Sequence, residues 1–68
     1  MNEEAFNLGV RKFLKKFGVT AQREIEKAVD DGVRDGKLRG SETLKARAIL
    51  TIDGLPMQVV IDDDIPLA

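Results

Sequence analysis

The residues of this chain that could do chemistry are acids, amines, guanidinium groups and one serine. The 68 residues include no histidine, cysteine, tyrosine or tryptophan. Histidine is the commonest general base and transition-metal ligand, and cysteine supplies nucleophiles, zinc ligands and disulfides. Without these side chains, proton transfer would fall to Asp, Glu or Lys. The composition therefore weighs against an enzyme and excludes a disulfide framework.

The densest group of metal-capable side chains is the run Asp62-Asp63-Asp64. Carboxylates suit calcium or magnesium, but a site needs several converging oxygens. In a strand, Asp63 points away from its two neighbours, so we interpret the run as a charged strand end that discourages aggregation. Ser41, the only serine, lies in neither a G-x-S-x-G nor an S-x-x-K motif. We expect no catalytic residue, no metal and no cofactor.

Apolar periodicity predicts two helices in the first half of the chain. The first runs from about residue 3 to 17, with Asn2 as N-cap and Gly18 as the left-handed residue after its end. Thr20 caps the second, which runs from 21 to about 36, although Gly32 could also end it. The apolar residues at helical spacing are Phe6, Val10, Phe13, Leu14 and Phe17, then Ala21, Ile25, Ala28, Val29, Gly32 and Val33.

A β-hairpin is predicted in the second half, with strands at about 44–53 and 55–62. The period changes to two at Leu44, and Asp53-Gly54 favours a two-residue type I′ turn. That turn pairs Leu50 with Met57, but a four-residue turn also keeps the apolar faces matched, so the register stays open. The residues from about 63 onward are candidates for disorder.

The expected fold class is therefore α+β, with two antiparallel helices packed on one face of the hairpin and residues 1–68 in a single domain. So short a chain buries little apolar surface, and a two-stranded hairpin leaves open edges. We expect a homodimer formed through the hairpin, with Ile49 and Val60 between the copies. Leu8 projects between charged residues on the polar side of the first helix. Together with Arg11 and Lys15, it is a second candidate contact with a partner, whose identity the sequence does not give.

The alternative function is a weak winged-helix-like nucleic-acid binder. Residues 13–20 resemble the turn of a helix-turn-helix, and Arg11, Arg23 and Lys27 would contact the nucleic acid. The formal net charge of −1 and the absence of a base at the supposed wing tip make a nucleic-acid partner the weaker prediction. No apolar run is long enough for a membrane span, and the acidic amino terminus lacks the pattern of a secretory signal. We expect no membrane partner and a cytoplasmic protein.

The sequence also resembles a known family. The similarity is carried by Met1–Asn7 (MNEEAFN), by RKFLKK at 11–16, by GVT at 18–20 and by QREIEKAV at 22–29, and extends more loosely through the hairpin. The family consists of short bacterial proteins of about this whole length, catalogued as a domain of unknown function. The resemblance implies a bacterial cytoplasmic protein without an assigned activity, and it supplies no catalytic motif.

Overall fold

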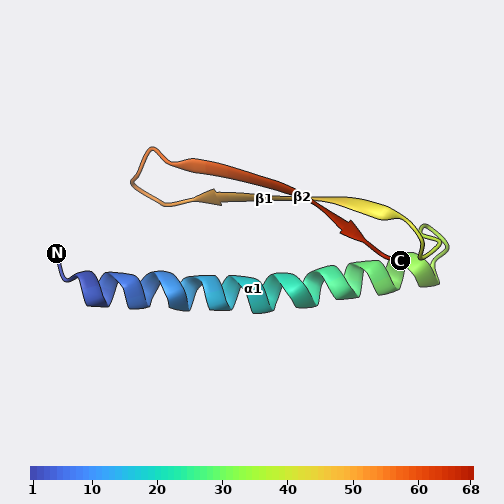
Figure 1. The fold of residues 1–68 in the computed structure, drawn as a ribbon, viewed down its shortest axis with the longest axis horizontal. Helices are drawn as coiled ribbons and strands as arrows, with labels where there is room; N and C mark the ends of the chain where they lie inside the picture. Colours follow the sequence, from blue (N-terminus) through green and yellow to red (C-terminus); the bar gives the residue numbers. More distant parts are fainter. The chain divides into compact units, whose positions relative to one another are not determined.

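The computed structural model describes residues 1–68 and contains one helix followed by two strands (Figure 1). Helix α1 spans Glu3–Arg34, strand β1 spans Thr43–Thr51, and strand β2 spans Gln58–Pro66. The chain divides into two compact units, residues 1–37 and residues 38–68. The fold class is α+β, as predicted, with a single helix.

Both ends of α1 are capped by residues with the expected chemistry. The Asn2 side chain accepts a hydrogen bond from the Ala5 amide at 3.0 Å, which confirms Asn2 as the N-cap. At the other end Gly36 has a φ of 79°. The Gly36 amide donates to the Val33 carbonyl and the Lys37 amide to the Gly32 carbonyl, at 3.2 and 2.9 Å, which is a Schellman ending. The predicted stop near residue 36 is therefore confirmed.

The predicted division into helices at 3–17 and 21–36 is wrong. The α1 backbone continues through Gly18, whose φ is not positive, and through Thr20, which caps nothing. The helix is drawn without a break in Figure 1. A glycine inside a helix costs only about 1 kcal/mol relative to alanine, so Gly18 permits a break without requiring one. The apolar stripe also passes from Phe17 to Ala21 at the helical interval of four residues. The chain therefore has no antiparallel helix pair of its own.

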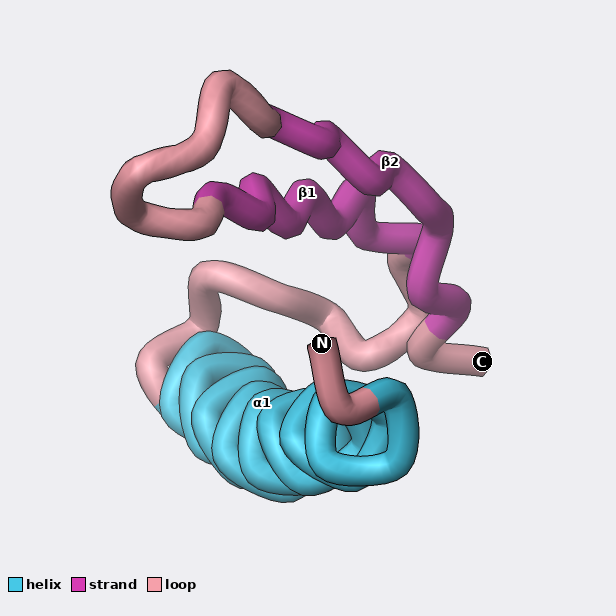
Figure 2. Tube along the Cα trace, turned by 90° about the vertical axis from the view of Figure 1, so that its left-hand side faces the viewer, coloured by secondary structure: helices cyan, strands magenta, loops and turns pink.

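The hairpin forms, but with other bounds and a longer connection than predicted. Strand β1 spans Thr43–Thr51, where 44–53 was predicted, so it ends two residues earlier than expected. Strand β2 spans Gln58–Pro66, where 55–62 was predicted, so it begins three residues later and ends four residues later. Its pairing with β1 includes Asp63 and Pro66, so the residues from 63 that were candidates for disorder contribute to the ladder. The strands are antiparallel and form a two-stranded sheet (Figures 1 and 2).

The type I′ turn expected at Asp53-Gly54 is absent. Only Gly54 has a positive φ, of 86°, whereas a type I′ turn needs one at both central residues. The Leu55 amide donates to the Ile52 carbonyl at 3.1 Å, and this geometry matches a type II turn with Gly54 at its third position. Leu50 pairs with Val59, and this register corresponds to the four-residue alternative.

The strands keep the predicted alternation of faces. Leu44, Ala46, Ala48 and Leu50 are partly covered, while the residues between them are exposed. Across the ladder these four residues face Ile65, Asp63, Ile61 and Val59. No residue of the chain is buried, in the helix or in the hairpin. The secondary structure therefore presents apolar faces without enclosing a core.

Candidate functional site

One face of the hairpin carries the apolar pair that the sequence singled out. Ile49 and Val60 are direct cross-strand partners, and their exposed fractions are 60% and 47%. The neighbouring pair on this face is Arg47 with Asp62, whose Nε and Oδ1 atoms are 2.8 Å apart. The structure thus brings Ile49 and Val60 together as a small apolar patch beside an ion pair.

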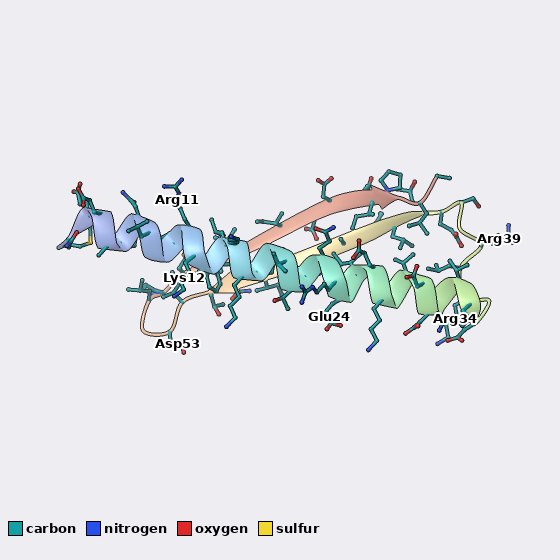
Figure 3. The ribbon with its side chains drawn as sticks, turned by 90° about the horizontal axis from the view of Figure 1, so that it is seen from below. Arg11, Lys12, Glu24, Arg34, Arg39 and Asp53 are labelled. Carbon is teal, nitrogen blue, oxygen red and sulfur yellow. The ribbon has the colours of Figure 1, made fainter.

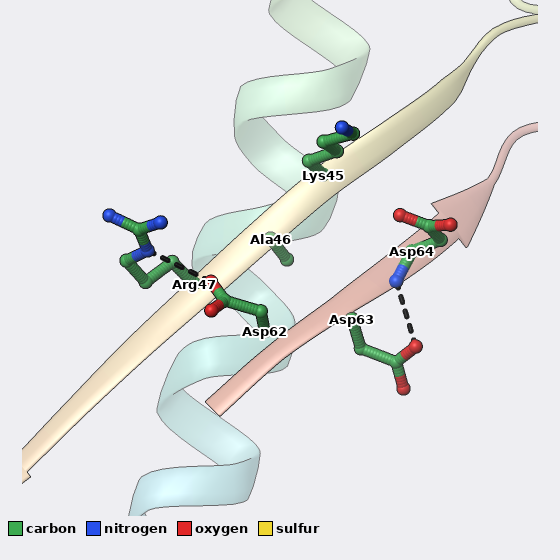
Figure 4. Close-up of a pocket in the computed structure, with 6 residues that line it drawn as sticks. All are labelled: Lys45, Ala46, Arg47, Asp62, Asp63 and Asp64. Atoms are coloured by element: carbon green, nitrogen blue, oxygen red, sulfur yellow. Dashed lines mark hydrogen bonds and ion pairs between the residues drawn. The ribbon is translucent and has the colours of Figure 1, made fainter. Parts of the chain in front are cut away.

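A shallow depression with mostly charged side chains lies on the sheet at this ion pair. It is lined by Lys45–Arg47 and Asp62–Asp64 (Figure 4). Asp62 is engaged by Arg47, and the Asp63 carboxylate accepts a hydrogen bond from the Asp64 amide at 2.8 Å. No group of three acidic side chains in the chain is arranged to hold a metal ion. The depression is a surface of alternating charge with the bases of β1 opposite the acids of β2.

The candidate contact on α1 contains three residues that a helix places on one side. Leu8, Arg11 and Lys15 follow each other at intervals of three and four residues, and Leu8 is 64% exposed. At about 100° per residue, this side of the helix lies opposite Phe13 and Phe17. Leu8 is therefore an isolated apolar side chain among bases, not part of the main apolar surface.

The residues of the nucleic-acid alternative are not gathered on one surface. Arg23 and Lys27 lie one turn apart, but Arg11 lies about 18 Å from Arg23 along the helix axis and on another side. Acidic residues share the second half of α1 with them, as Figure 3 shows for Glu24. The helix-turn-helix that motivated this alternative does not exist, because the helix has no turn at residues 18–20.

The apolar residues predicted at helical spacing form one exposed stripe along the whole of α1. Phe6, Phe13 and Phe17 in this stripe are each about half exposed. At its middle is a shallow, almost wholly apolar depression lined by Phe13, Lys16, Phe17, Thr20 and Ala21. The signal that predicts this continuous surface is the unbroken four-residue interval from Phe17 to Ala21 to Ile25.

Glu42 organises the loop that connects α1 to β1. Its carboxylate accepts hydrogen bonds from the amides of Arg39, Gly40 and Ser41 at 2.9 to 3.2 Å. These bonds, that from Arg39 foremost, lower the pKa of Glu42 below its usual value. Gly40, with a φ of 94°, allows the backbone to turn its amides toward one point. The loop is a closed polar turn whose donors are already used.

The fold and these surfaces define a small α+β protein with exposed apolar faces. Over residues 1–68 the chain matches the model of a family of unknown function, DUF6494, and belongs to that family. The resemblance seen in the sequence is thereby confirmed. Comparison with curated proteins and with solved structures gave no match. No helix in the structure has the length and apolar character needed to cross a membrane.

Proposed function

We propose that this protein is a non-enzymatic interaction module that works as a homodimer. One observation supports the proposal most strongly. No residue is buried, although both the helix and the hairpin carry long apolar faces. Transfer of apolar surface out of water is the dominant favourable term in association. A second copy supplies the cover that each unit needs, and in the proposed dimer the α1 stripe is the main contact.

The hairpin adds a smaller contact in this proposal. The patch of Ile49 and Val60 is apolar, and two-stranded sheets expose an unpaired edge on each strand. Leu8, with Arg11 and Lys15, lies on the opposite side of α1 from the stripe, and we assign it to a further protein partner. The cytoplasmic location expected from the sequence stays a prediction.

Sedimentation equilibrium of the wild-type chain tests the proposal directly. A monomer has a mass of 7.5 kDa, so a dimer at micromolar concentration gives about 15 kDa. A mass of 7.5 kDa at every concentration would remove the proposal.

The hairpin contact is tested by Ile49→Lys, with Thr51→Lys as the matched control on the same face of β1. Loss of one buried isoleucine per copy weakens dimerisation by about tenfold or more. The control places the same charge two residues away, where no apolar side chain is lost, and leaves the dissociation constant nearly unchanged. Equal dissociation constants for the two variants would exclude Ile49 from the interface.

A further inference from the structure

The apolar stripe of α1 contains eight residues whose spacing reads the same in both directions. They lie at intervals of four, three, four, four, four, three and four residues. They are Phe6, Val10, Phe13, Phe17, Ala21, Ile25, Ala28 and Gly32. When a second copy of the helix is laid antiparallel with its midpoint at the level of Val19, each of these eight residues meets another of the eight. Leu14, Val29 and Val33, the other apolar residues at helical spacing, lie outside this set. A dimer with a two-fold axis uses the same surface on both copies, so that surface must be complementary to itself.

The sizes of the paired side chains are complementary in three of the four pairs. Phe6 falls opposite Gly32, Phe17 opposite Ala21, and Val10 opposite Ala28. Each of these pairs joins a larger side chain with a smaller one, so two helices can approach closely without overfilling the space between them. The apolar depression at Phe13, Phe17 and Ala21 lies next to the two-fold axis, where it receives Phe17 of the second copy.

Charge favours the same direction of pairing. Residues 3–18 hold four bases against two acids, a net charge of +2. Residues 20–35, which include the C-cap, hold three bases against five acids, a net charge of −2. Antiparallel pairing sets the basic half of each helix against the acidic half of the other, whereas parallel pairing sets like against like. It also opposes the two helix dipoles head to tail.

From these observations we infer that two copies of the chain associate through an antiparallel α1–α1 pair, centred at the level of Val19. The inference rests on the proposed homodimer and specifies its main interface. The mean interval along the stripe is about 3.7 residues, slightly longer than the 3.6 of a straight helix, which gives the pair a weak right-handed twist.

Disulfide trapping tests the direction of the pair, because the chain contains no cysteine of its own. Val10→Cys and Ala28→Cys are made as separate variants and mixed in equal amounts under mild oxidation. The mixture is expected to give a disulfide between the two variants. Each variant alone stays uncrosslinked, since equivalent positions in an antiparallel pair lie about 27 Å apart, beyond the roughly 7 Å that a disulfide spans between Cα atoms.

Lys27→Cys is the matched control, since residue 27 lies at almost the same level of α1 but away from the stripe. Mixed with Val10→Cys, it is expected to form little or no disulfide. Crosslinking of Val10→Cys with itself would show a parallel pair and overturn the inference. A wild-type dimer whose variants give no mixed disulfide would overturn it too and leave the proposed homodimer standing, whereas a wild-type monomer would remove both.

Discussion

Gly18 and Gly36 show how one residue type serves two different backbone conformations in the same chain. Gly36 adopts a φ of 79° and ends α1, while Gly18 lies in the regular interior of the helix. An added Cβ would meet no other atom within 4 Å at either position. Backbone conformation alone therefore decides the effect of an alanine at each glycine.

We predict opposite effects for the two alanine substitutions. Gly18→Ala raises the free energy of unfolding by about 0.5–1 kcal/mol, because alanine is the better residue inside a helix. Gly36→Ala lowers it by about 1 kcal/mol or more, because a side chain disfavours positive φ. Thermal unfolding followed by circular dichroism at 222 nm, at one protein concentration, measures both. Destabilisation by Gly18→Ala would indicate two helices separated by a turn at Gly18.

At Glu42 the relevant property is protonation. Backbone amides, Arg39 first, hold the pKa of this carboxyl below its usual value. The ordering of the loop is therefore complete above the usual carboxyl pKa and is lost as the pH falls through the lowered value. NMR titration of the Arg39 amide is expected to show its largest shift in this acidic range. Glu42→Gln should remove the shift, and its persistence in that variant would assign the titration to another group.

At the scale of elements, the sequence predicted the two ends of α1 better than its middle. The N-cap at Asn2, the stop near Gly36 and the faces of the strands are each set by a few neighbouring residues, so local patterns suffice. The continuity of α1 depends on the balance between a weak helix breaker at Gly18 and the hydrogen bonds of a 32-residue helix. The connection at residues 52–57 likewise admitted two registers with the same faces, because strand periodicity is two.

The candidate site was predictable only in part for the same reason. Ile49 and Val60 share a face in any register that keeps the alternation, and their direct pairing follows from the observed ladder. The α1 stripe was recognised residue by residue but divided between two helices. Its mirror-like spacing across Phe17 and Ala21 becomes visible only when the helix is continuous.

The hairpin carries one ion pair whose energetic effect can be measured. The Arg47 and Asp62 side chains are more than half exposed, so their attraction is screened by water despite the 2.8 Å distance. A double-mutant cycle with Arg47→Ala and Asp62→Ala is expected to give a coupling of at most about 1 kcal/mol, falling toward zero in 1 M salt. A coupling that high salt leaves unchanged would show a contact of another kind.

At the scale of the whole molecule, the chain has two elements that are weak by themselves. An isolated two-stranded hairpin is marginally stable in water, and most of a helix's stability comes from packing of its apolar face. No residue in the single chain is buried. In the proposed homodimer, dimerisation contributes to folding itself, so we expect the unfolding temperature to rise with protein concentration. An unfolding temperature that is constant over a hundredfold range of concentration would show that folding does not depend on association.

The most direct test of self-association is sedimentation equilibrium of the wild-type chain over a range of micromolar concentrations. The proposed homodimer predicts a mass that rises with concentration toward about 15 kDa, twice the 7.5 kDa of one chain. A mass that stays at 7.5 kDa over the whole range would contradict it.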